Sequence, residues 1–139
     1  MKERPIGLHL AQVQKTVARA FNEALAEAGG TVPVWLVLHS IARGSPGSQL
    51  HIARSVGIEG PTLTRHLDGL EEAGLVVRRR DPDDRRAVRV ELTEEGKRLY
   101  AALLEAATAF DRRLTAGLDE ADLAQLRELL ARLAANAGS

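Results

Sequence analysis

The side chains with the strongest chemical character in this chain of 139 residues are arginines gathered in one short segment. Residues 75–92 hold six arginines against four acidic residues, whereas residues 93–139 hold six basic and eight acidic ones. A guanidinium presents a planar fork of donors that matches phosphate oxygens, and it suits the negative potential of a narrow minor groove. The arginines of this segment therefore indicate a surface that binds a polyanion, although the chain as a whole has a formal charge of zero. The alternative is that these arginines form an ordinary solvated strand face.

The stretch just before these arginines is predicted to be a helix with one polar face. Leu63, Leu67 and Leu70 recur at helical spacing, and Pro61 suits the first helical position. Gly74 follows the last turn, where a left-handed cap is expected. The residues between the leucines, which should face outward, are Thr62, Thr64, Arg65 and Asp68. Such a helix is suited to enter a groove of duplex DNA.

After Gly74 the apolar period changes from that of a helix to that of a strand. Val76 and Val77 open a strand that continues into arginines, and Val88, Val90 and Leu92 alternate on the return. Residues 81–86, between the two predicted strands, supply turn formers and two further arginines. The pattern predicts a β-hairpin with a basic tip, which could contact a minor groove while the helix lies in the major groove.

The other elements are predicted to be helices that position this helix and hairpin. Residues 8–28 show helical spacing closed by two glycines, and Thr31 can cap a second, largely apolar helix. Ser48 can cap a short helix that precedes the one beginning at Pro61, and two such helices joined by a Gly-containing turn are typical of a helix-turn-helix. Thr93 can cap a helix of roughly 22 residues, about 33 Å long. Asp119, with Asp122 three residues on, can cap a last helix rich in leucine.

These elements predict a single mainly α domain over residues 1–139 with a small β-hairpin wing, that is, a winged helix-turn-helix. The predicted DNA-binding lobe covers residues 31–93. The helices within 8–28 and 97–136 carry apolar seams that nothing else in the chain is large enough to cover. We therefore expect them to pack against the same helices of a second copy, with a monomeric bundle as the alternative.

Several classes of function are disfavoured by the sequence. The chain has no cysteine, and its four histidines, which are His9, His39, His51 and His66, are scattered, so no metal site is expected. No carboxylate pair, nucleophile with a neighbouring base or Gly-rich phosphate loop is present, which argues against an enzyme and against a cofactor. No apolar run spans a bilayer and no apolar signal core opens the chain, so a cytoplasmic location without membrane attachment is expected.

Four stretches of the sequence together resemble one family. They are residues 35–39, residues 52–63, residues 70–76, and the run from Asp83-Asp84-Arg85-Arg86 to Leu92-Thr93-Glu94-Glu95-Gly96. The chain resembles the MarR family of bacterial winged-helix regulators over nearly its whole length, and the SlyA-like branch most closely. The resemblance implies a homodimeric, sequence-specific regulator of transcription, a repressor of a pseudo-palindromic operator on double-stranded DNA. The alternative is a winged-helix protein-interaction module that does not bind DNA, which the zero net charge would favour.

The resemblance also implies roles for individual residues. Arg86 would enter the flanking minor groove, with Arg85 beside it and Asp84 as the carboxylate that braces it. Arg78, at the base of the wing, would contact a phosphate or form an internal ion pair. The positions implied to contact DNA from the helix are Pro61, Thr62, Thr64 and Arg65.

Members of this family often bind a small ligand between the dimerisation helices and the DNA-binding lobe. The candidates here are Trp35 and His39, one helical turn apart, together with His9 and Arg19 on the first helix. They could receive a small anionic or phenolic effector. The alternative is that Trp35 belongs to the core and that His39 is a partly buried histidine with a satisfied hydrogen bond.

Overall fold

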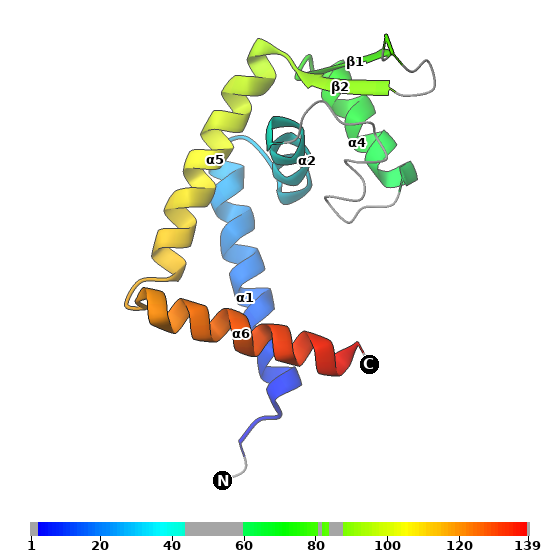
Figure 1. Cartoon of the computed structure of the whole chain (residues 1–139). Coiled ribbons are helices and arrows are strands. Elements are labelled where there is room, and N and C mark those ends of the chain that lie inside the picture. Colours follow the sequence, from blue (N-terminus) through cyan, green and yellow to red (C-terminus); the bar gives the residue numbers. More distant parts are fainter. Residues whose placement is uncertain (1–2, 44–59, 81, 84–87, 139) are drawn as a thin grey trace. The chain divides into compact units, whose positions relative to one another are not determined.

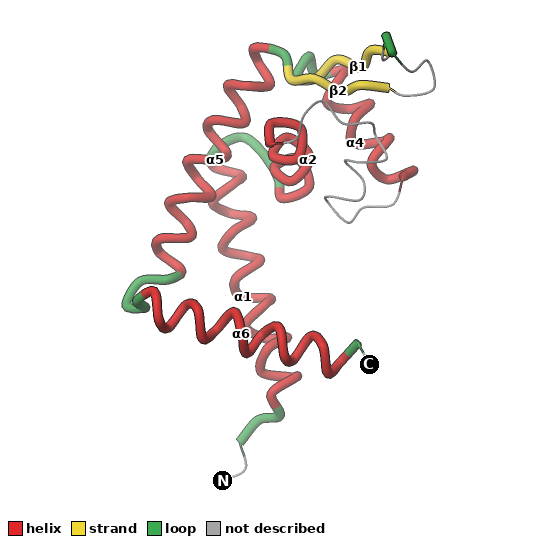
Figure 2. The backbone as a smooth tube through the Cα atoms, in the orientation of Figure 1, coloured by secondary structure: helices red, strands yellow, loops and turns green. Residues whose placement is uncertain are grey.

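A computed structural model describes residues 3–43, 60–80, 82–83 and 88–138. The described elements are five helices and two strands (Figures 1 and 2): α1 (Ile6–Glu27), α2 (Val32–Arg43), α4 (Gly60–Glu72), β1 (Val76–Arg80), β2 (Val88–Leu92), α5 (Glu94–Leu114) and α6 (Glu120–Ala137). This order confirms the mainly helical fold with one hairpin that the sequence predicts. The short helix expected from Ser48 lies outside the described residues.

The chain divides into two compact units, Met1–Ala107 and Thr108–Ser139. The first unit contains α1, α2, α4, the hairpin and most of α5, and the second contains the end of α5 and α6. No single described helix has the length and apolar character needed to cross a membrane, although α1 and α2, bent by 72° at their junction, meet that requirement as a pair.

The core of the first unit joins every one of its elements. Its fully buried side chains are Leu25, Val37, Leu38, Leu63, Leu67, Val76, Val90 and Leu103. They come from α1, α2, α4, both strands and α5, so the leucine stripe predicted for α4 is buried as expected. The described core residues of α1 lie in its C-terminal half, whereas Leu10 and Val13, in its N-terminal half, stay 41% and 45% exposed.

The two strands form an antiparallel hairpin whose register decides where each arginine points. Val76 pairs with Leu92, Arg78 with Val90 and Arg80 with Val88. Since side chains alternate between faces, Arg78 shares the face of the buried Val76 and Val90. Arg79 lies on the opposite, exposed face.

The turn between α4 and β1 is fixed by local hydrogen bonds. Gly74 adopts a φ of 78°, its amide donates to the carbonyl of Glu71, and the Leu75 amide donates to the carbonyl of Leu70 at 2.9 Å. These are the two bonds of a Schellman motif, which confirms the left-handed cap expected at this glycine. At its other end, α4 begins at Gly60, one residue before the predicted start at Pro61.

The start of α5 is tied to the same turn. The Thr93 hydroxyl accepts the Gly96 amide at 3.0 Å, as predicted for a capping residue, and donates to the carbonyl of Gly74 at 2.6 Å. A Cβ at Gly96 would lie only 2.0 Å from the carbonyl oxygen of Leu75. The close approach therefore requires glycine. The start of the hairpin, after α4, and its end, before α5, are held together at this point.

The second unit begins its last helix as the sequence predicts. The Asp119 carboxylate accepts the Asp122 amide at 2.8 Å, and the Asp122 carboxylate accepts the Asp119 amide at 3.1 Å, which forms a capping box. No residue of α6 is buried. Its exposed leucines are Leu126, Leu129, Leu130 and Leu133.

Candidate nucleic-acid interface

The exposed face of α4 carries most of the residues predicted to contact DNA. The leucine stripe points into the core, so Pro61, Thr64 and Arg65 are exposed and Thr62 is half-buried. The Thr64 hydroxyl donates to the carbonyl of Gly60 at 3.0 Å. This face presents short polar groups and a cation that could reach base edges or phosphates.

Arg65 is the exposed cation of this helix. Within the described part of the chain it makes no hydrogen bond or ion pair. Its five donors are therefore available to a ligand at no cost in broken internal bonds.

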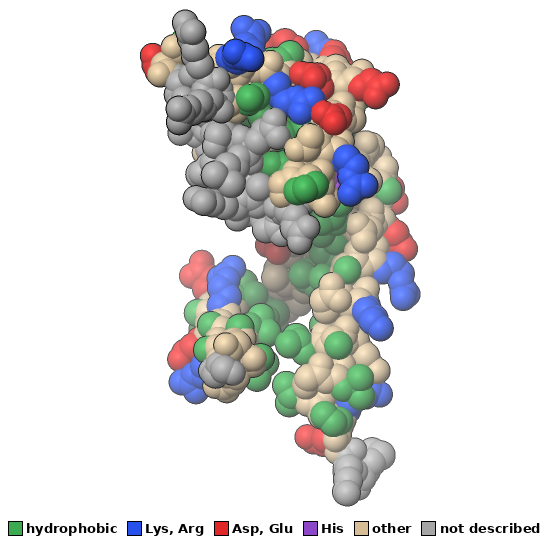
Figure 3. Space-filling model, turned by 90° about the vertical axis from the view of Figure 1, so that its right-hand side faces the viewer, with side chains coloured by type: hydrophobic (Ala, Val, Ile, Leu, Met, Phe, Trp, Pro, Cys, Tyr) green, Lys and Arg blue, Asp and Glu red, His purple; other side chains and the backbone are tan. Residues whose placement is uncertain are grey.

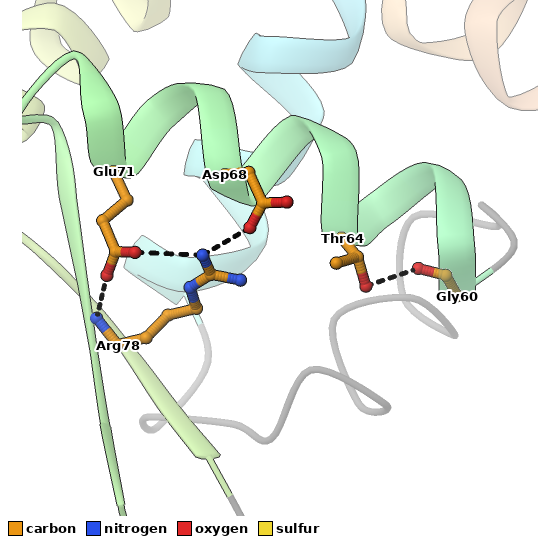
Figure 4. A network of polar contacts seen from close by, with 5 residues as sticks. All are labelled: Gly60, Thr64, Asp68, Glu71 and Arg78. Atoms are coloured by element: carbon orange, nitrogen blue, oxygen red, sulfur yellow. Dashed lines mark hydrogen bonds and ion pairs between the residues drawn. The ribbon is translucent and has the colours of Figure 1, made fainter.

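Arg78 lies in a different environment (Figure 4). One of its guanidinium nitrogens lies 2.5 Å from a carboxylate oxygen of Asp68 and 3.0 Å from one of Glu71. The Arg78 backbone amide donates to the other oxygen of Glu71 at 3.3 Å. The Glu71 carboxylate thus holds both the side chain and the main chain of Arg78. Of the two roles that the resemblance implies for Arg78, the structure contains the internal ion pair.

These contacts change the acidity of both partners. Hydrogen bonds from the side chain and backbone of Arg78 lower the pKa of Glu71 below its ordinary value of 4.5. Hydrogen bonds to Glu71 and Asp68 raise the pKa of Arg78. Two carboxylates thus pair with one guanidinium.

The other wing residues are placed only in part. Arg79 approaches Glu91 at 3.8 Å across the exposed face of the hairpin, and Arg80 is exposed. The wing-tip residues predicted to enter and brace the minor-groove contact, Asp84, Arg85 and Arg86, lie outside the described residues.

Trp35 and His39, the two α2 residues predicted to line an effector site, come together with a residue that the sequence analysis did not single out. Tyr100 of α5 stacks on Trp35 with ring centroids 5.8 Å apart, and its hydroxyl lies 3.1 Å from Nδ1 of His39. Trp35 is 9% exposed and belongs to the core, while His39 is half-buried. We call Trp35, His39 and Tyr100 the aromatic cluster. Tyr100 lies one turn before Leu103 and Leu104 in a helix predicted to be amphipathic, and helical spacing to the buried Leu103 is the signal that could have placed it on the inner face.

His39 is tuned by these surroundings. Burial, and then the positive charge of Arg43, lower the pKa of its imidazole below the ordinary value of 6.5. The neutral ring is therefore favoured, and it can share a hydrogen bond with the phenol of Tyr100.

The other two predicted effector residues are not drawn into this cluster. Among the described residues, no hydrogen bond, ion pair or ring contact joins the side chains of His9 or Arg19 to it. His9 instead lines an open depression of about 370 Å³ with Glu3, Arg4 and Ile6. His9 and Arg19 are ten positions apart, about 15 Å along the helix axis. Within the described ranges no group of three or more acidic or histidine side chains could hold a metal ion.

Comparisons with known proteins point to one family. The sequence model of the MarR family matches residues 31–88. A MarR-family transcriptional regulator from Rhodococcus sp. RHA1 is 33% identical with a TM-score of 0.77, over 93% of this chain and 91% of that one. The transcriptional repressor CouR, in a structure with a 23-mer DNA duplex, is 33% identical with a TM-score of 0.82, over 94% and 92% of the two chains. CouR from Rhodococcus jostii RHA1 bound to p-coumaroyl-CoA is 34% identical with a TM-score of 0.80, over 93% and 91%.

Proposed function

The chain belongs to the MarR family of DNA-binding transcriptional regulators, and we propose that it binds a pseudo-palindromic operator as a homodimer and acts as a ligand-responsive repressor. The observation that carries this proposal is the polar face of α4. Its leucine stripe is buried in the core, and the opposite side presents Pro61, Thr64 and Arg65 to solvent. Within the described residues the Arg65 side chain makes no hydrogen bond or ion pair. CouR, which shares the fold at a TM-score of 0.82, is known in a complex with duplex DNA.

We assign the DNA contacts of this regulator by element. The first turns of α4 enter a major groove, where Thr64 and Arg65 contact base edges and phosphates. The tip of the hairpin, with Arg85 and Arg86, reaches the flanking minor groove. In a dimer the two α4 helices would contact half-sites about 34–36 Å apart, one turn of the duplex.

Fluorescence anisotropy with the DNA upstream of the protein's own gene tests this assignment. Binding should weaken about 10³–10⁵-fold between 50 and 200 mM salt if roughly 6–10 phosphates are neutralised. Arg65→Ala should cost about 1–3 kcal/mol and relax the preference for specific over random duplex, because a base contact is lost. Arg112→Ala, which removes an exposed arginine on α5 outside the predicted lobe, is the matched control.

The result that would reject this assignment is equal binding by the wild type, Arg65→Ala and Arg112→Ala. The competing function, a winged-helix module that binds only protein, predicts no duplex binding even at 50 mM salt. Zero net charge favours that module, whereas the exposed, cationic Arg65 on the polar face of α4 favours duplex DNA.

We propose that the repressor releases DNA when a small anionic or phenolic ligand binds. The support is the complex of CouR with p-coumaroyl-CoA, an anionic thioester whose acyl group carries a phenol, and the aromatic cluster of this chain. Trp35 and Tyr100 offer ring faces, and His39 and Tyr100 offer the polar atoms that could hold a phenol or carboxylate. In the same anisotropy assay, addition of such an effector should lower the affinity for the operator.

A further inference from the structure

The ion pairs of Arg78 are unusual for a surface that is to meet DNA. Arg78 contributes one positive charge, while Asp68 and Glu71 contribute two negative charges, so the group as a whole is negative. Both carboxylates stand on α4, the helix assigned to the major groove, and both are partly exposed. A group that served only to attract phosphates would not be matched with two carboxylates, because they cancel its field and repel the duplex.

The geometry of the contacts indicates what the group does instead. The contacts of Arg78 join the middle of β1 to the last turns of α4 (Figure 4). Glu71 accepts from both the backbone amide and the guanidinium of Arg78, whereas Asp68 accepts from the guanidinium only. Among the described residues, the hairpin also meets α4 at the turn at Gly74 and through the buried Val76 and Val90, which share the core with the α4 leucines. The contacts of Arg78 therefore restrain the hairpin at a further point beyond that turn.

The length of the hairpin makes this restraint important. Arg80, at the end of β1, lies four residues beyond Val76, about 13 Å at 3.3 Å per residue. A tilt of about 10° at the turn would displace the end of the described strand by about 2 Å. Since α4 and the wing tip must reach neighbouring grooves of the same duplex, a displacement of that size would prevent both from docking at once.

We propose that Arg78, Asp68 and Glu71 form a clamp that sets the angle of the wing to α4, and that Arg78 is a positioning residue for operator recognition rather than a phosphate contact. The clamp lowers the entropy that the wing loses on binding, because the wing is already held in its docked orientation. This inference rests on the proposed DNA-binding function.

The two readings of Arg78 predict effects of opposite sign. If Arg78 contacts phosphate, then Glu71→Gln and Asp68→Asn release it and remove negative charge, so both variants should bind DNA more tightly. If Arg78 positions the wing, the same two variants loosen the clamp and should bind the operator more weakly, although each makes the protein more positive. Glu72→Gln is the matched control, because it makes the same charge change on the same helix at an exposed residue that makes no hydrogen bond or ion pair within the described ranges.

Anisotropy titrations at one salt concentration, with operator and random duplexes, would decide between the readings. We expect Glu71→Gln and Asp68→Asn to lose on the order of tenfold in operator affinity, with a smaller change for random DNA. Glu72→Gln should bind as tightly as the wild type or slightly more so. Circular dichroism melts of each variant would show that the fold is retained, as expected for changes at partly exposed side chains.

A double variant separates the clamp from direct contacts by the carboxylates. In the Arg78→Ala background, Glu71→Gln should have no further effect, because the clamp is already open. A loss that persists in that background, or tighter binding by Glu71→Gln alone, would overturn the inference. A wild-type protein that binds no duplex at all would instead overturn the proposed function, so the two failures are distinguishable.

Discussion

Arg65 and Arg78 are the same side chain in opposite electrostatic surroundings. Arg65 stands exposed on α4, whereas Arg78 is held by two carboxylates and by its place on the inner face of the hairpin. A free guanidinium gains its full hydrogen-bonding energy from a new partner, while a paired one must first break bonds. This difference is why we assign DNA contact to the first and wing positioning to the second.

His39 shows the same dependence on surroundings for a titratable group. Because its pKa is lowered in the folded protein, the unfolded chain binds a proton more readily than the folded one. Stability should therefore be highest above the ordinary value of 6.5 and should fall as the pH drops from there through the folded pKa. The groups that face this imidazole are Tyr100 on α5 and Trp35 and Arg43 on α2.

Urea unfolding at pH 7.5 and pH 5.5 would test this expectation. The free energy of unfolding should drop less between the two pH values for His39→Gln than for the wild type, since the variant has no proton to gain at this site. His9→Gln, which makes the same change at an exposed histidine of α1, should behave as the wild type does. An equal drop in all three proteins would show that His39 does not contribute to the pH dependence.

At the scale of elements, one junction organises the DNA-binding part of the molecule. The end of α4, the start of β1 and the start of α5 meet where Thr93 bonds to Gly74 and where Gly96 passes under the carbonyl of Leu75. Helix, hairpin and long helix are thereby fixed to one another at a single point. The Arg78 clamp adds its restraint a short distance along the hairpin.

Gly96→Ala is expected to break this junction. Alanine normally stabilises a helix interior by about 0.5–1 kcal/mol relative to glycine, but here its methyl would lie 2.0 Å from a backbone oxygen. The backbone must shift, so we expect a net loss of stability on the order of 2 kcal/mol. Thermal and urea unfolding would measure it.

Gly69→Ala is the matched control for that experiment. Gly69 lies within α4, and a Cβ at this position meets nothing within 4 Å. The variant should be as stable as the wild type or more stable, following helix propensity alone. Equal stability changes for the two alanine variants would contradict the steric explanation.

At the scale of the whole molecule, the notable feature is uncovered apolar surface. Large hydrophobic side chains stay 37–61% exposed on α1 and α6, and Figure 3 shows hydrophobic side chains at the surface. They are Ile6, Leu8, Leu10 and Val13 on α1, and Leu126, Leu129, Leu130 and Leu133 on α6. Apolar patches of this kind mark interfaces between proteins. They support the proposal that the helices at both ends of the chain pack against a second copy.

Sedimentation velocity would test the dimer. The wild type should sediment as a species of twice the 15.0 kDa chain mass, and Leu126→Glu with Leu130→Glu should shift it to the monomer, because carboxylates would be buried at the interface. Ala124→Glu adds a carboxylate to the same helix away from the leucine stripe and should remain dimeric. A wild type that is monomeric at micromolar concentration would reject the proposal, as would a dimer that survives both leucine substitutions.

For the described part of the chain, the sequence by itself determined the helices and strands, their order and most of their ends. The leucine stripe of α4, the alternation in the hairpin and the caps at Gly74, Thr93 and Asp119 all lie where the pattern predicts. These features depend on hydrogen bonds and side-chain periods that span only a few residues, so the local sequence contains all the information they need.

Only the tertiary structure decided how those elements use their side chains. The hydrogen bond between His39 and Tyr100 joins residues 61 positions apart, and the pairing of Arg78 with Asp68 follows from the register of the hairpin against α4. The same packing buries Leu25 and leaves Leu10 exposed on one apolar stripe of α1. Side-chain partners and burial of this kind depend on which surfaces meet in three dimensions. The pattern of residue types along the chain does not specify which surfaces meet.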